Sequence, residues 1–165
     1  MHFACTSELG PFFRSRPLLI GQAIGAVGCF ASGFLPLFGG PGYEAALFAG
    51  VLLPSTAAVS AAIAVSSTRV GAFDALGRGV AQGLCLAGVG LALSLIHGLR
   101  VGFCDLWDGA AVFCLGPGVG AVLGGAFGAG AGLLASLASL RWKRLAWAVL
   151  IALAGPLGSI GLSLW

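Results

Sequence analysis

The sequence predicts an all-α fold: a polytopic integral membrane helix bundle with five transmembrane helices, the N-terminus inside and the C-terminus outside. Two observations favour this fold class. Of the 165 residues, 59% are hydrophobic and only 8% are charged, whereas a soluble domain carries about 25% charged residues. The charged residues also fall in clusters between long uncharged stretches. This composition excludes a water-soluble surface, and it excludes disorder, which requires a polar and charged sequence.

Five apolar stretches are each long enough to cross a membrane. A helix rises about 1.5 Å per residue, so about 20 residues cross a hydrocarbon core of roughly 30 Å. The stretches lack the alternation of apolar and polar residues that is typical of barrel strands, so we expect helices, whose backbone groups bond internally. The predicted spans cover residues 17–38, 45–66, 79–99, 118–140 and 145–165.

The fourth predicted span begins at a helix-breaking sequence. Residues 109–140 are too many for one crossing, and a Gly-Pro-Gly sequence at 116–118 interrupts them. Proline lacks an amide donor, and glycine weakens a helix on either side of it. We therefore expect residues 102–116 to form a loop or a short interfacial helix, with Trp107 at headgroup depth. A re-entrant element is the alternative.

The basic residues predict the orientation of the spans. Seven of the eight Lys and Arg residues fall in segments on the side of the N-terminus, and only Arg100 falls on the other side. Basic residues accumulate in cytoplasmic loops. We therefore expect a cytoplasmic N-terminal segment at 1–16 and a single transmembrane domain at 17–165, in the plasma (inner) membrane. Two alternatives stay open: residues 1–33 resemble a cleaved signal peptide, and the chain can be the membrane part of a longer protein.

The cysteines offer one candidate disulfide. The five cysteines show no CxxC pair and no metal-ligand spacing. Cys29 and Cys85 lie inside predicted spans, where they act as small apolar residues. Cys104 and Cys114 fall in the predicted outer loop, where an oxidising compartment would allow a bridge between them. Two free thiols are the alternative.

Gln22 and Gln82 are the strongest polar groups inside the predicted spans. No Asp, Glu, Lys or Arg falls within these spans. Proton-coupled carriers place charged groups at membrane depth, so the sequence argues against a self-contained carrier of that kind. Both glutamines lie near the cytoplasmic start of their spans, where their side chains can form an interhelical hydrogen bond. We expect this bond to have a structural role.

Five glycines recur every four residues along the fourth predicted span: Gly116, Gly120, Gly124, Gly128 and Gly132. Small residues at this spacing let helix backbones approach closely, as in a glycine zipper. A period of four drifts by about 40° per step against 3.6 residues per turn, so we expect two different partner helices. The first and third predicted spans are the expected partners. The alternative is a second copy of the chain in a homo-oligomer, or another membrane subunit.

A speculative polar cluster is expected at the outer surface, made of Glu44, His97, Asp105 and Asp108. A histidine with carboxylates can bind a divalent metal or accept a proton. Sparse charges at a membrane interface usually only anchor helices, so we predict no catalytic residue, no metal site and no cofactor.

Three functions remain compatible with the sequence. Motifs for nucleic-acid binding, phosphate binding and hydrolysis are absent from it. We therefore expect a non-enzymatic membrane protein that anchors or assembles a larger structure, with the lipid bilayer as partner and no nucleic acid. One alternative is a channel or permease subunit for a small or neutral solute, favoured by the helix-breaking Pro54, Pro117 and Pro156. The least favoured is a membrane enzyme acting at the outer surface.

Overall fold

The computed structural model describes residues 15–35, 42–68, 70–102, 105–138 and 141–163, without the side chains of 141, 156, 157 and 159–163. Within these ranges the chain is helical and forms no strand, which confirms the predicted all-α class. The elements are α2 (Arg16–Ser32), α3 (Tyr43–Ser66), α4 (Ala72–Val101), α5 (Leu106–Phe113), the π-helix η1 (Cys114–Gly118), α6 (Val119–Ser136) and α7 (Arg141–Ser163).

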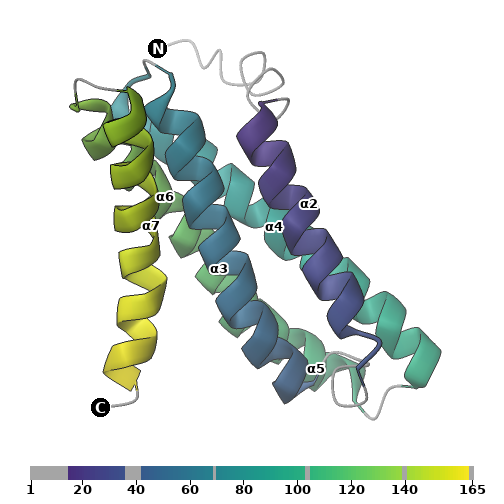
Figure 1. The fold of residues 1–165 in the computed structure, drawn as a ribbon. Coiled ribbons are helices and arrows are strands. Elements are labelled where there is room, and N and C mark those ends of the chain that lie inside the picture. The colour runs from purple at the N-terminus through teal and green to yellow at the C-terminus, as the bar shows by residue number, and fades with distance from the viewer. Residues whose placement is uncertain (1–14, 36–41, 69, 103–104, 139–140, 164–165) are drawn as a thin grey trace, which may run out of the picture.

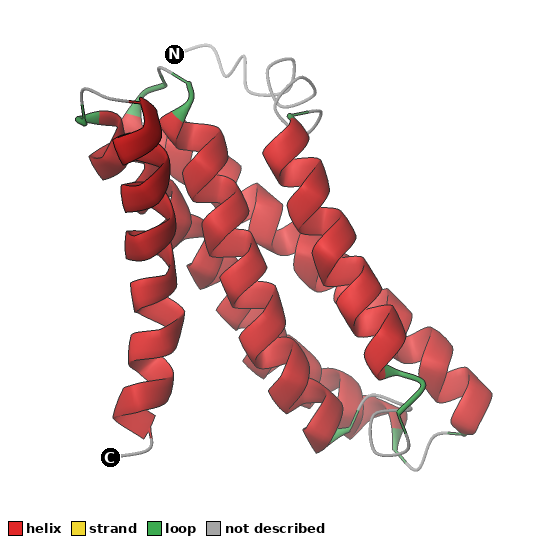
Figure 2. Cartoon of the chain, viewed as in Figure 1, coloured by secondary structure: helices red, strands yellow, loops and turns green. Residues whose placement is uncertain are grey.

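The helices run alternately between two ends of the molecule (Figures 1 and 2). The described chain makes five passes, because α5, η1 and α6 join into one continuous helix. Helix α2 begins at one end, and α7 finishes at the opposite end (Figure 1). This order follows the order of the predicted spans. The predicted segment at 1–16 and the ends of the first, fourth and fifth spans lie partly outside the described residues.

Among the described residues, three helices are long and apolar enough to cross a membrane: α3, α4 and the continuous helix Leu106–Ser136, with 24, 30 and 31 residues. At about 1.5 Å per residue the shortest of them measures about 36 Å, against a hydrocarbon core of roughly 30 Å. Helix α2 has 17 residues, or about 26 Å. The fold therefore indicates an integral membrane protein with three candidate spans, while the five spans and their orientation stay predictions.

The expected helix break at 116–118 is wrong. The helix continues through these residues as η1, which contains Pro117. A π-helix bonds each amide to the fifth preceding carbonyl, and its wider turn accommodates a residue that cannot donate a hydrogen bond. Within residues 102–116, α5 covers Leu106–Phe113 and η1 begins at Cys114. The expected short interfacial helix is therefore also wrong, because α5 continues through η1 into α6 as one helix of 31 residues. The Asp105 side chain caps the start of this helix by accepting the amides of Trp107 and Asp108 at 3.0 and 3.1 Å.

Helix α6 packs directly against the backbone of α3. A Cβ atom on Gly124 would lie 2.5 Å from the carbonyl oxygen of Pro54. Gly128 faces the backbone of Ala58 in the same way, one turn further along both helices. The residue numbers rise together, so α3 and α6 run parallel (Figure 1). Glycine is required along this face because any side chain would force the two backbones apart.

A second face of α6 packs against α4. Gly79 of α4 lies against Gly125 and Ala129, and Gly83 lies against Ala121. Here the residue numbers run in opposite directions, so α4 and α6 are antiparallel. The residues that face α4 are offset by about one position from those that face α3. Helix α6 therefore contacts both neighbours at the same depth, and α3, α4 and α6 together form the centre of the bundle.

The expected partners of the glycine repeat, the first and third predicted spans, are not the helix that the repeat faces, which is α3. Helix α6 does contact α4, the third predicted span, but through Ala121, Gly125 and Ala129, which are not part of the repeat. The repeat does not turn to a new partner, because Gly124, Gly128 and Gly132 all face α3 along two parallel helices. At the start of the repeat, Gly116 has open space around it and Gly120 meets only a proline ring.

Helix α7 covers the remaining side of α3 and α6. Its contact consists of alanines from the three helices, which form one buried cluster: Ala58, Ala62, Ala131, Ala135, Ala148 and Ala152. Helix α2 packs on the other side, against α3 and α4. The two outer helices α2 and α7 are therefore separated by the face of α3 that lies between them.

Substitution of Gly128 by alanine is expected to destabilise the bundle. The new Cβ atom would meet the backbone of Ala58, which can yield only if the two helices separate. Overpacking of this kind costs about 1–3 kcal/mol. Thermal unfolding of the purified chain in detergent measures the loss.

Gly130→Ala is the matched control, because no atom lies within 4 Å of the position of its Cβ. Alanine favours a helix over glycine by about 1 kcal/mol, so this variant should be at least as stable as the parent. Equal losses in both variants would contradict the packing described for α6.

Candidate functional site

A polar network joins α2, α3 and α4 inside the bundle. The Gln22 Nε2 atom donates to Gln82 Oε1 at 3.1 Å. Gln82 is 0% exposed, and its Nε2 atom donates to Ser60 Oγ at 3.3 Å and to the Leu18 carbonyl oxygen at 3.5 Å. The structure thus brings Gln22 and Gln82 together. Both polar atoms of the Gln82 amide form hydrogen bonds. The buried side chain therefore avoids the free-energy cost of a polar group that is removed from water without a partner.

Small residues make room for this network. A Cβ atom on Gly21 would lie 2.6 Å from the Cβ atom of Ser60, so α2 approaches α3 closely at that point. The Ser60 hydroxyl also donates to the Thr56 carbonyl oxygen at 2.6 Å. The groups in the network are uncharged, and they bond to one another. Their arrangement fixes the position of α2 against α3 and α4.

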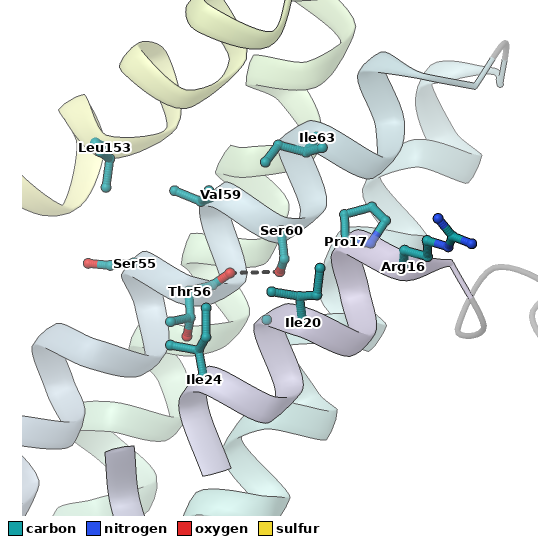
Figure 3. A pocket seen from close by; sticks show the side chains of 11 residues that line it. Arg16, Pro17, Ile20, Ile24, Ser55, Thr56, Val59, Ser60, Ile63 and Leu153 are labelled. Carbon is teal, nitrogen blue, oxygen red and sulfur yellow. Dashed lines mark hydrogen bonds between the residues drawn. The ribbon is translucent and has the colours of Figure 1, made fainter. Parts of the chain in front are cut away.

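A lateral groove of about 480 Å³ lies beside the network. Helix α2 forms one wall, α3 forms the floor, and Leu153 of α7 lies on the far side (Figure 3). The lining is mostly apolar, with residues such as Ile20, Ile24 and Val59. Arg16, at the start of α2, is the one charged residue in the described lining. The groove is therefore an apolar depression along the bundle surface, and Arg16 borders one end of it.

Three hydroxyl side chains line the groove, those of Ser55, Thr56 and Ser60, and the last two are bonded within α3. Thr56 Oγ1 donates to the Leu52 carbonyl oxygen at 2.9 Å, and Ser60 Oγ donates to the Thr56 carbonyl oxygen (Figure 3). Bonds from a Ser or Thr side chain to the preceding turn of its own helix are common in apolar surroundings. The floor therefore presents methyl and methylene groups more than free donors, which suits an apolar occupant.

A second cavity, of about 350 Å³, lies between α3 and η1 at the other end of the bundle. Tyr43, Ala46 and Gly50 of α3 line it, together with Gly116 and Pro117 of η1. The small residues at one-turn intervals on α3 leave the space open. A π-helical turn beside a cavity is a common feature of functional sites in helical proteins.

The expected outer polar cluster does not assemble into one site. Glu44 lies in the first turn of α3, His97 lies near the end of α4, and Asp105 and Asp108 lie at the start of α5. Among the described residues, no three His, Cys, Asp or Glu side chains come close enough to hold a metal ion. Asp105 has a structural role instead, as the N-cap of α5.

His97 is buried against α2 and does not face the outer surface. It is 4% exposed, and its ring centroid lies 5.5 Å from that of Phe30 and 5.1 Å from that of Phe34. One turn later, Arg100 Nη2 donates to the Gly33 carbonyl oxygen at 2.6 Å, and its guanidinium lies 4.5 Å from the Phe34 ring centroid. These contacts, which the sequence analysis missed, attach the end of α2 to the end of α4.

The candidate disulfide stays a prediction. Cys114 of η1 is exposed and carries a free thiol, while Cys104 lies outside the described residues. Cys29 is buried in the core cluster with Leu53 and Leu86, as expected for a small apolar residue, and Cys85 is exposed on α4.

A double-mutant cycle tests the glutamine pair. Gln22→Leu, Gln82→Leu and the double variant are expected to show a coupling of about 0.6 kcal/mol, and at most about 2 kcal/mol, as found for hydrogen bonds between membrane helices. Unfolding in detergent measures each free energy. A control cycle that combines Gln22→Leu with Ser136→Ala, in the last turn of α6, should show no coupling. Equal coupling in both cycles would contradict a direct bond.

Comparisons with protein-family models, with curated proteins and with solved structures found no match to this chain.

Proposed function

We propose that the chain is a non-enzymatic, multi-pass membrane protein of the anchoring or assembly type, with helices packed through small residues. The observation that carries the proposal is the contact of the α6 backbone with α3 and α4. Gly125 lies against the Gly79 backbone, and Gly128 lies against the Ala58 backbone. At these contacts the three helices leave no space for a solute between them. A rigid body with an uncharged interior is suited to holding a position in the membrane.

The proposed orientation places the starts of α2 and α7 on the cytoplasmic side of the plasma (inner) membrane. The described basic residues at that end are Arg16, Arg78, Lys143 and Arg144. The opposite end carries Arg100 together with the acidic Glu44, Asp105 and Asp108. This distribution supports the orientation because basic residues are retained in the cytoplasm during insertion.

The proposed partners are the lipid bilayer and other membrane subunits, or a second copy of the chain. Large apolar side chains such as Ile24, Val27 and Leu84 are exposed on α2 and α4. In an aqueous protein such a surface would favour aggregation, whereas in a membrane it faces lipid or another helix.

A channel or permease subunit for a small neutral solute is the second candidate. The cavity between α3 and η1 favours it, because Pro117 and the π-helical turn lie in its wall. Irregular helices at membrane depth are used by transporters to bind their substrates.

Fusion of a reporter tests the orientation. A reporter that is active only in the cytoplasm should work when fused after Arg144, at the start of α7, and should fail when fused after Asp108, at the start of α5. These positions lie at opposite ends of the bundle (Figure 1). The reverse pattern of activity would overturn the proposed orientation.

Solute flux separates the two candidate functions. Liposomes that contain the full chain are expected to take up glycerol and urea no faster than protein-free liposomes, as measured by stopped-flow light scattering. Extraction from the native membrane in mild detergent should yield a complex heavier than one chain.

Rapid uptake that Gly50→Phe abolishes would contradict the anchoring function and support the permease. Gly50 lines the cavity beside η1. Gly88→Phe is the control, because the Cβ position of Gly88 has open space around it, and it should leave any uptake unchanged.

A further inference from the structure

We propose that the groove between α2 and α7 binds one acyl chain of an anionic phospholipid, with the lipid phosphate at Arg16. This site goes beyond the anchoring function, which requires no specific lipid. The groove has a volume of about 480 Å³ and opens on the side of the bundle. Its occupant is identified by three properties of the groove: its lining, its length and its single charge.

The lining selects a hydrocarbon chain. Ile20 and Ile24 form the wall on α2, Val59 lies on the floor, and Leu153 lies opposite them (Figure 3). The hydroxyls of Thr56 and Ser60 donate to carbonyl groups of their own helix, so they do not require a polar ligand. Inside a bilayer, close packing of the acyl chain against the groove stabilises such a complex.

The length of the groove distinguishes a lipid from a partner helix. Its wall on α2 extends from Arg16 to Ile24, which corresponds to about 12 Å along the helix axis. That distance is within one leaflet, about half of a hydrocarbon core of roughly 30 Å. A transmembrane helix from another subunit would need a groove along the full thickness of the core. An acyl chain from a single leaflet needs only the length observed.

The charge at the mouth selects an anionic headgroup. Arg16 is exposed at the first turn of α2 and borders one end of the apolar groove. A guanidinium group binds phosphate oxygens through paired hydrogen bonds. The N-terminal end of a helix also carries a partial positive charge that favours an anion. The apolar groove and the basic mouth together match the two parts of a phospholipid.

Native mass spectrometry of the full chain tests this site. The chain is released from detergent micelles that contain equal amounts of phosphatidylglycerol and phosphatidylcholine. We expect one phosphatidylglycerol to be retained per chain, in preference to phosphatidylcholine. Arg16→Gln should reduce this preference about fivefold, the effect of one basic residue near an anionic surface. Lys143→Gln, at the same end of the bundle but outside the groove lining, should leave the preference unchanged.

A pair of variants on α2 tests the groove itself. Ile24 and Val27 are both exposed, at 51% and 66%, but only Ile24 lines the groove. Ile24→Trp should fill the groove and weaken lipid retention at least tenfold, whereas Val27→Trp should have no effect. Val59→Phe fills the groove from the floor and serves as a second test if Ile24→Trp is not monodisperse.

Three results would overturn the proposal: no preference between the two lipids, equal loss of retention in Ile24→Trp and Val27→Trp, or a second protein chain retained in place of the lipid. The first and second would indicate general lipid coating of the bundle. The third would indicate a protein interface. Flux and oligomer mass, which test the anchoring function, are measured independently of lipid retention, so the two proposals can fail separately.

Discussion

Apolar helices gain no hydrophobic free energy by associating in lipid, because lipid tails are as apolar as leucine. The bundle therefore depends on how closely its helices can approach, and this distance is set by the glycine faces of α6. Gly124 and Gly128 place the α6 backbone on that of α3, and Gly125 places it on that of α4. Each dispersion contact contributes only about 0.1–0.2 kcal/mol, and many of them together hold the bundle. The remaining helices are arranged around this centre.

The contacts of the two outer helices, α2 and α7, explain how these helices are held and why a groove lies between them. Helix α2 is attached at one end by the bond between Gln22 and Gln82, and at the other by Arg100, whose guanidinium bonds to the Gly33 carbonyl. Helix α7 packs on the opposite side of α3 through alanines. Because α2 and α7 do not meet over α3, the floor between them stays open, and Arg16 lies at its end. The proposed lipid site is thus a consequence of how the core is packed, and it lies away from the close contacts of α6.

The sequence predicts the helical class and the approximate helices well, because length and hydropathy alone determine which segments enter a membrane. It also predicts that Gln22 and Gln82 lie at similar depth, which the direction of each span implies. It does not correctly predict which helix packs against the glycine repeat. The spacing of the glycines shows that they share one face of their helix, but it does not show which other helix lies on that face. The π-helical turn at Pro117 and the burial of His97 were missed for a related reason. Both depend on neighbours that are distant in the sequence: η1 lies against the start of α3, and His97 fills the space above Gly33 at the end of α2.

Glycine at the contact between α6 and α3 stabilises this bundle more than a large apolar side chain would. The most direct measurement compares the unfolding temperatures of Gly124→Leu and Leu123→Ala in detergent. Leu123 is 64% exposed, whereas a Cβ atom on Gly124 would lie 2.5 Å from the Pro54 carbonyl oxygen. We expect a large loss of stability for Gly124→Leu and little change for Leu123→Ala, the reverse of a water-soluble core, where large-to-small changes cost about 2–5 kcal/mol. A greater loss for Leu123→Ala, or no loss for Gly124→Leu, would contradict packing through glycine at this contact.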